Sequence, residues 1–313
     1  MTNTNEKYRL ITRSDFDGLV CAVLLKDLGL IDKILFVHPK DMQDGKIEVG
    51  PLDITTNLPY VEGCHLAFDH HASEAIRNKA NMVENYVLHP QADSAARVVY
   101  DYYGGFSRFP HIDKGMMEAV DKADSAKFSM EDVLNPQGWE LLSFLMDART
   151  GLGRFHSFKV SNYHLMMDLI EYCKNHTIEE IFLLPDVQER VELYRKYEQQ
   201  FKDQLLRCST VSNHLVVLDL RNEETIYPGN RFMIYALFPK TSISIHVIWG
   251  FQKQNTVFAC GKSIFNKSSR TNIGLLMLEY EGGGHEAAGT CQIAHDQAEQ
   301  VLLELKEKIS RDG

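Results

Sequence analysis

The stretch HLAFDHH, residues 65–71, decides the fold of the N-terminal half of this 313-residue chain. Its first four residues form a mostly apolar run of the length of a short β-strand, and Asp69, His70 and His71 follow directly. Adjacent side chains of a strand point to opposite faces, so the two histidines cannot share a face. We therefore expect one of them to bind a metal ion and the other to hydrogen-bond to the substrate or to a neighbouring carboxylate.

Other short apolar runs in this half alternate with helical patterns, and polar clusters again fall where strands end. Strands are predicted at residues 8–12 (YRLIT), 34–38 (ILFVH), 53–57 and 65–68, and helices at residues 18–29, 94–103 and 114–123. Strands that alternate with helices indicate an α/β fold with a parallel sheet, and the site of such a fold lies at the carboxyl edge of the sheet.

The character of the chain changes near residue 177. A long charged segment without glycine or proline, residues 187–208, predicts a helix that connects two domains. Beyond it, strands are predicted at residues 214–220, 232–238, 243–249 and 256–260, followed by a helix at 272–280, a glycine-rich turn and a final helix at 297–309. We therefore expect an N-terminal domain at residues 1–185, a helical connector at 186–209 and a smaller C-terminal α/β domain at 210–313.

Composition narrows the class of protein. Charged residues make up 24% of the chain, as in an average globular protein, and the net charge of −10 argues against a protein that coats duplex nucleic acid through many lysine and arginine contacts. The six cysteines are scattered without a CxxC pair, so we expect buried reduced thiols. No apolar run approaches the roughly 18 residues that a membrane span needs, so a soluble cytoplasmic protein without a membrane partner is expected.

Two further polar clusters in the N-terminal half are candidate metal ligands. In SDFDG, residues 14–18, a turn beyond the first strand lets Asp15 and Asp17 converge on metal ions, while Gly18 permits a sharp entry into the helix. The alternative is an ordinary acidic cap of that helix. Asp124 follows a helical run and precedes a serine, which suits another metal ligand, although a solvated helix end is equally consistent with it.

The C-terminal half contains the stretch GGGHEAAG, residues 282–289, preceded by KSSRT at residues 267–271. Glycines such as Gly283 and Gly284 let backbone amides approach an anion closely, and His285 can donate a hydrogen bond to it. Arg270 can bind a phosphate or a carboxylate through two parallel hydrogen bonds. These residues predict a site for a terminal phosphate group.

Taken in order, the motifs SDFDG, FDHH, ADSAKF, SSRT and GGGHEAAG resemble those of the DHH phosphoesterase superfamily with its C-terminal DHH-associated domain. That superfamily includes RecJ-like exonucleases, oligoribonucleases and cyclic-dinucleotide phosphodiesterases, and the chain looks most similar to bacterial exopolyphosphatase-like members. The resemblance extends from about residue 10 to about residue 290. It implies an N-terminal domain that binds Mn²⁺ or Mg²⁺, a C-terminal domain that binds substrate, and an active site between them.

The sequence departs from the family pattern at two positions. The first motif usually opens with a metal-binding histidine, where this chain has Arg13, and the second usually supplies a metal-bridging aspartate, where it has Asn57. Asp53, four residues earlier, is a possible substitute for that aspartate. The remaining positions match: the resemblance implies that Asp17, Asp69, His70 and Asp124 are metal ligands and that Asp15 and His71 are catalytic residues.

The resemblance implies that the two changes affect the two metal positions unequally. The first ion would use the missing histidine, Asp15 and the bridging group, whereas the second would use Asp17, His70, Asp124 and the bridging group, for which an amide oxygen can still serve. A guanidinium does not lose its proton and repels a nearby divalent ion. Our hypothesis is that Arg13 stands in for the first ion, although the sequence leaves open whether one or two ions bind.

The sequence therefore predicts a metal-dependent phosphohydrolase that acts on a short phosphorylated substrate. Arg13 would hold a phosphoryl oxygen, and Asp15 or His71 would orient the attacking water. An oligonucleotide, including a short single strand, a dinucleotide and polyphosphate all remain candidate substrates, although no dense run of lysine and arginine favours polyphosphate. The alternative is a catalytically impaired nucleotide- or phosphate-binding protein on the same scaffold, and a homodimer is possible in either case.

Overall fold

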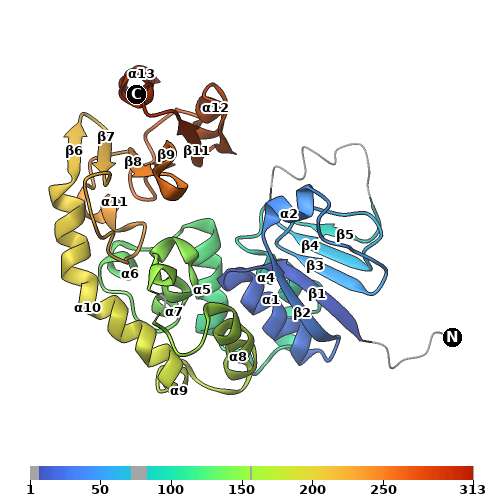
Figure 1. Ribbon diagram of the computed structural model, residues 1–313. Coiled ribbons are helices and arrows are strands. Elements are labelled where there is room, and N and C mark those ends of the chain that lie inside the picture. Colours follow the sequence, from blue (N-terminus) through green and yellow to red (C-terminus); the bar gives the residue numbers. More distant parts are fainter. Residues whose placement is uncertain (1–6, 72–82, 156, 313) are drawn as a thin grey trace. The chain divides into compact units, whose positions relative to one another are not determined.

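The computed structural model describes residues 7–71, 83–155 and 157–312 of the chain (Figure 1). These residues group into two units. The first comprises Met1–Phe128, Pro136–Ala148 and Leu152–Glu192, and the second comprises Ser129–Asn135, Arg149–Gly151 and Leu193–Gly313. The division falls inside the long helix α10, Pro185–Arg207, so this helix belongs partly to each unit.

The first unit contains a five-stranded parallel sheet with the strand order β2-β1-β3-β4-β5, which confirms the predicted α/β fold. The strands are β1 (Tyr8–Arg13), β2 (Ile31–Val37), β3 (Asp53–Thr56), β4 (Leu66–Asp69) and β5 (Tyr86–Leu88). Besides the start of α10, the α-helices of this unit among the described residues are α1 (Phe16–Asp27), α2 (Pro39–Gln43), α4 (Ala95–Tyr102), α5 (Lys114–Ser125), α7 (Gly138–Met146), α8 (Asn162–Asn175) and α9 (Ile178–Ile181).

Helix α1 forms the centre of the first unit. It is apolar on all sides, so residues 16–25 are buried, and it packs against α4, α5 and α8 as well as against β1 and β2. The entry into α1 is tight, because a Cβ atom on Gly18 would lie 2.0 Å from the carbonyl oxygen of Arg13. Only glycine fits this approach, and it brings the first turn of α1 directly beneath the end of β1.

The second unit contains a six-stranded mixed sheet with the order β10-β11-β9-β8-β7-β6. The strands are β6 (Ser209–Ser212), β7 (Leu215–Asp219), β8 (Ile243–Trp249), β9 (Thr256–Lys262), β10 (Gly283–His285) and β11 (Ala288–Ile293). The helices are α6 (Met130–Leu134), α11 (Met233–Leu237), α12 (Ile273–Leu278) and α13 (Ala298–Asp312). Alternate residues of β8 share a core with α12 and α13, as the period of two along a strand requires.

Two sequence-based assignments in the second unit were wrong. The predicted strand at residues 232–238 is instead helix α11 (Met233–Leu237) with its two caps, because a continuous apolar run of this length fits a buried helix as well as a buried strand. The buried side chain of Asn230 favours the helix by accepting a hydrogen bond from the backbone N–H of Phe232 at 2.9 Å. The predicted glycine-rich turn is the hairpin β10–β11, with Gly284 paired to Gly289.

Among the described residues, no helix is both long enough and apolar enough to cross a membrane.

Candidate active site

The carboxyl ends of β1, β3 and β4 bring the N-terminal candidate residues together. Arg13 ends β1, Asp15 and Asp17 lie at the start of α1, Asn57 directly follows β3, and Asp69 ends β4. His70 and His71 follow Asp69, and Asp124 reaches the same place from the last turn of α5. Residues from four stretches of sequence thus meet at one edge of the parallel sheet.

Asp17, His70 and Asp124 form what we call the three-ligand cluster. Their potential ligand atoms all lie within 4.8 Å of one another. The Nε2 atom of His70 approaches Oδ2 of Asp124 to 2.7 Å, yet in the described structure it is not aligned for a hydrogen bond with any acceptor. Nitrogen and oxygen atoms that lie this close together without a hydrogen bond between them are typical of ligands that share one cation. Two carboxylates and an imidazole are a suitable ligand set for a divalent transition metal such as Mn²⁺.

Backbone groups already hold two members of this cluster. The carboxylate of Asp17, which is 2% exposed, accepts hydrogen bonds from the backbone N–H groups of Ala95 at 2.9 Å and Ala96 at 2.7 Å, at the start of α4. The Nδ1 atom of His70 lies 3.1 Å from the carbonyl oxygen of Ala92. Because a carbonyl only accepts, Nδ1 carries the proton, and Nε2 is the nitrogen that can bind a cation.

The charges of the cluster are strongly coupled. Burial, reinforced by the nearby Asp124 carboxylate, raises the pKa of Asp17 to about 7. Burial alone would lower the pKa of His70, but the close approach of the Asp124 carboxylate and the charge of Asp17 raise it to about 9. Burial opposes ionisation of Asp124, whereas His70 outweighs this effect and lowers the pKa of that carboxyl. Buried carboxylates therefore attract a positive charge to this place, which a divalent cation can supply by displacing the proton of His70.

Beside the cluster, the side chains of Arg13, Asp15 and Asn57 form a second group, which we call the arginine trio. Nε of Arg13 lies 2.9 Å from Oδ2 of Asp15, and Nδ2 of Asn57 donates to Oδ1 of Asp15 at 3.2 Å. Oδ1 of Asp15 also accepts from the backbone N–H of Gly18 at 3.0 Å, so Asp15 caps α1 as the alternative reading of the sequence had it. Asp15 thus serves the fold and the site together.

The position of Asp53 differs from that of Asn57. Asp53 begins β3, and its carboxylate pairs with Arg9 at 2.7 Å and accepts from the backbone N–H of Gly50. Asn57 directly follows the other end of the same strand. The length of β3 therefore separates Asp53 from the three-ligand cluster, and it does not substitute for Asn57 there.

Asp69 is fully buried and acts as an acceptor for its surroundings. Its Oδ1 atom accepts from the backbone N–H of His70 at 2.8 Å and lies 2.6 Å from Nδ1 of His71, while Oδ2 accepts from the hydroxyl of Tyr86 at 3.1 Å. Burial would lower the pKa of His71, but the hydrogen bond to Asp69 outweighs it and raises that pKa. The structure thus places Asp69 as the residue that orients His71 through Nδ1, which leaves Nε2 of His71 to face other groups.

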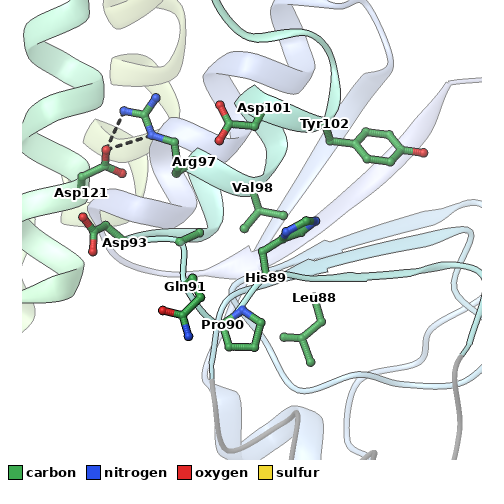
Figure 2. A pocket seen from close by; sticks show the side chains of 11 residues that line it. Leu88, His89, Pro90, Gln91, Asp93, Arg97, Val98, Asp101, Tyr102 and Asp121 are labelled. Atoms are coloured by element: carbon green, nitrogen blue, oxygen red, sulfur yellow. Dashed lines mark hydrogen bonds and ion pairs between the residues drawn. The ribbon is translucent and has the colours of Figure 1, made fainter.

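A pocket of about 600 Å³ adjoins the site within the first unit (Figure 2). Its lining comes from the segment between β5 and α4, from α4 itself and from α5: Leu88, His89, Pro90, Gln91, Ala92, Asp93, Arg97, Val98, Asp101, Tyr102 and Asp121. Figure 2 shows Arg97 reaching Asp121, with Nη2 to Oδ2 at 2.6 Å. Ala92 belongs to this lining and also contacts His70, so one peptide segment borders both the pocket and the cluster.

The remaining candidates, Arg270, Gly283, Gly284 and His285, lie in the second unit, and Arg270 and His285 are exposed. Most glycines of their motif have a packing role. A Cβ atom on Gly284 would lie 2.3 Å from the carbonyl oxygen of Ala288, and one on Gly289 would lie 2.9 Å from Cγ of Met277 in α12. A Cβ atom on Gly283 would meet no described atom within 4 Å, so only this glycine borders open space.

Sequence reasoning missed the residues that support the cluster. These are the amide groups of Ala95 and Ala96, the hydroxyl of Tyr86, and Ser94, whose hydroxyl caps α4 and donates to Asp121 at 2.7 Å. A serine before a predicted helix does signal a cap. A lone tyrosine in a short strand carries no comparable signal.

No known family profile and no curated protein matches the chain. Among solved structures, a pGpG-specific phosphodiesterase, PggH from Vibrio cholerae, is 61% identical, with a TM-score of 0.88 over 98% of this chain and 100% of that one. RecJ from Thermus thermophilus in complex with Mn²⁺ is 12% identical, with a TM-score of 0.55 over 98% of this chain and 52% of that one. CDC45 from Entamoeba histolytica is 11% identical, with a TM-score of 0.51 over 98% and 95%. At such low identity, the last two likenesses concern the fold alone.

Proposed function

This chain belongs to the DHH phosphoesterase superfamily and is a hydrolase of short phosphorylated substrates, and we propose that its substrate is a 5′-phosphorylated dinucleotide of the pGpG type. The single observation that carries this proposal is the 61% identity to the pGpG-specific phosphodiesterase, which extends over the whole of that protein. Identity at this level over the whole of both chains favours the same substrate class over polyphosphate or longer oligonucleotides.

The proposed reaction consumes one water molecule. Its oxygen attacks the bridging phosphorus, the bond from phosphorus to the 3′ oxygen breaks, that oxygen takes up a proton, and pGpG yields two molecules of GMP. Asp17, His70 and Asp124 would hold a divalent cation, with Mn²⁺ favoured over Mg²⁺ by the imidazole ligand. When bound, the cation would supply positive charge to the phosphoryl group and acidify a water molecule.

The other residues of the site would orient the reactants. His71, held through Nδ1 by Asp69, would accept the proton of the attacking water through Nε2. Tyr86 and two backbone amides fix the Asp69 carboxylate, so the imidazole has one orientation. Arg13, which Asp15 holds at 2.9 Å, would bind a phosphoryl oxygen.

The second unit would supply the contact to the terminal phosphate. Arg270 and His285 are exposed polar side chains near a glycine hairpin, and the space around Gly283 admits an anion to the backbone. We retain the proposal that residues 210–313 act as a substrate-binding domain, joined by a helical connector at residues 186–209 to a catalytic domain at 1–185. Gly284, which lies in β10, would contribute to this phosphate site through its backbone.

The test is nucleotide or phosphate release from pGpG, a cyclic dinucleotide, a 5′-phosphorylated trinucleotide and polyphosphate, each with Mn²⁺, with the His70→Ala variant as the blank. We expect pGpG to be turned over fastest and the variant to be silent. Fastest turnover of polyphosphate would overturn the proposed substrate. If pGpG binds to a folded protein that turns over none of the four, the alternative of a catalytically impaired binding protein would replace the proposal.

A further inference from the structure

We propose that this site works with one divalent cation and not two, because the arginine trio fills the place of a second cation and presents Arg13 to the substrate phosphate. This inference rests on the proposed function and deepens it. Its basis is the difference between two neighbouring groups of polar side chains, the three-ligand cluster and the arginine trio.

The carboxylate of Asp15 is already saturated by protein donors. Its two oxygens accept from Gly18 N–H at 3.0 Å, lie 2.9 Å from Nε of Arg13, and accept from Nδ2 of Asn57 at 3.2 and 3.4 Å. A divalent cation bound to Asp15 would have to replace the guanidinium or lie directly against it. A guanidinium keeps its charge at any ordinary pH, so it repels such an ion. The group as it stands does not fit a metal ion.

A count of formal charges gives the same result. Asp69 and His71 pair with each other and are counted as neutral together; the carboxylates of Asp15, Asp17 and Asp124 and the guanidinium of Arg13 then leave two negative charges uncompensated, which is the charge of one divalent cation. A second such cation would give the buried site an excess positive charge before any substrate arrived. Charges in a buried site are stable only when they are paired.

Asn57 links the two groups. Its amide nitrogen is engaged by Asp15, and its backbone N–H donates to the carbonyl oxygen of Phe68 at 3.1 Å, beside Asp69. Its Oδ1 atom is buried and makes no hydrogen bond within the part of the chain that the structure describes. The residue is 1% exposed and holds a left-handed conformation with φ of 55°. This amide oxygen is thus available as a further, neutral ligand and would complete the set around a single cation.

Arg13 also retains donors for an anion. The contact with Asp15 uses Nε, and 34% of the Arg13 side chain stays exposed to solvent. The two terminal nitrogens of a guanidinium form a planar fork that matches two oxygens of a phosphate. Arg13 therefore binds a phosphoryl oxygen at the position where, in a site with two ions, the second cation would bind that oxygen.

The first experiment is the stoichiometry of Mn²⁺ binding to the full-length protein, measured by calorimetric titration and by elemental analysis after gel filtration. We expect one equivalent per chain. Two equivalents would overturn this inference and leave the proposed function intact. No binding at saturating Mn²⁺ would overturn the cation requirement of the proposed function itself, so the two failures are distinguishable.

A second experiment restores the residues that the family pattern has at these positions. We expect the double variant Arg13→His, Asn57→Asp to bind a second equivalent of Mn²⁺, because it regains an imidazole and a negative charge and loses the guanidinium. A folded double variant that still binds one equivalent would refute the claim that the trio excludes the second ion. Far-UV circular dichroism establishes folding, and the wild-type stoichiometry tests the inference if the variant does not fold.

A third experiment tests the contact with phosphate, using GMP as the probe in the presence of Mn²⁺. Arg13→Gln is expected to weaken GMP binding by about tenfold to a hundredfold, the range for a hydrogen bond to a charged group. Arg9→Gln is the matched control, since Arg9 lies near the opposite end of β1 from Arg13 and pairs with Asp53. We expect this variant to change the affinity for GMP by less than about twofold. Equal affinity of wild type and Arg13→Gln for GMP would overturn the role of Arg13.

Discussion

His70 in the first unit and His246 in the second are both largely buried, and their surroundings shift their pKa values in opposite directions. His70 lies between the carboxylates of Asp17 and Asp124, which raise its pKa to about 9 against the effect of burial. His246 lies on β8, its ring makes no hydrogen bond to any described residue, and burial lowers its pKa to about 4. Burial of a histidine therefore does not identify a site. The neighbouring carboxylates identify the site, because their negative charges favour the binding of a positive charge there.

The largest expected effect is a difference in kcat/KM between variants of these two histidines. His70→Ala should lower kcat/KM for pGpG by at least about a thousandfold, because several kcal/mol of charge stabilisation depend on the cation it would bind. His246→Gln removes an imidazole whose pKa is shifted by burial alone and should leave kcat/KM within about threefold of wild type. Steady-state kinetics with Mn²⁺ measures both. A similar loss of kcat/KM in both variants would show that the neighbouring carboxylates do not distinguish a functional histidine from a structural one.

The next largest effect is a difference in the free energy of unfolding between variants of two glycines, one from each unit. Gly18→Ala should destabilise the protein by about 1–3 kcal/mol, because the added Cβ would lie 2.0 Å from the carbonyl oxygen of Arg13. Gly283→Ala should change the free energy of unfolding by less than about 0.5 kcal/mol, since no described atom lies within 4 Å of its Cβ position. Urea unfolding followed by circular dichroism measures both. A destabilised Gly283→Ala variant would mean that this glycine too has a packing role.

A smaller effect is expected at Tyr86, which acts through Asp69. Tyr86→Phe removes only the hydroxyl that donates to Oδ2 of Asp69 at 3.1 Å, so the orientation of His71 should loosen. We expect kcat to fall by about tenfold, with KM and the Mn²⁺ stoichiometry unchanged. Tyr60→Phe is the matched control, because Tyr60 stacks on Tyr86 but its hydroxyl contacts Asn85. A fall in kcat of equal size in the control would point to packing as the cause.

The smallest effect is a pH dependence of stability that arises from His246. Its folded-state pKa of about 4 lies below the usual value of about 6.5, so the unfolded chain takes up the proton first as the pH falls. The contribution of this residue is present above about pH 6.5 and is lost progressively toward pH 4, with about 1 kcal/mol lost between pH 6.5 and 5.5. Urea unfolding across this range should show a flatter profile for His246→Gln. Parallel profiles would assign the pH dependence to other groups.

The sequence was sufficient for those parts of the molecule that depend on local pattern. The strands that end at Arg13 and Asp69, and helices α1, α4 and α5, follow from apolar periodicity with polar residues at the ends. The rule that parallel strands present their carboxyl ends at one edge predicted a site at that edge, whereas the grouping of Asp17, His70 and Asp124 around one ion was implied by the resemblance to the DHH phosphoesterase superfamily.

Other features could not be predicted because they depend on distant or ambiguous sequence. The strand β5 has three residues, too few for a periodic pattern, and the apolar run that became α11 fits helix and strand equally well. The amides that hold Asp17 come from residues 78 and 79 positions away, and Tyr86 and Asp69 are 17 positions apart. Such pairs are set by tertiary packing, and a single sequence contains no local trace of them.

The hydrogen bonds between Asp17 and the first turn of α4 have an entropic consequence. A side chain that becomes fixed when a ligand binds loses rotamer freedom, and this loss reduces the affinity. The rotamer of Asp17 is fixed when α4 forms, and the ring of His70 is fixed by Ala92, so an arriving cation orders neither. Among the described residues, Asp124 has no backbone donor and contacts only Nε2 of His70, the atom that would turn to the ion, so its ordering depends most on the ion itself. Cation affinity should therefore respond more to the freedom of α5 than to that of any strand of the sheet.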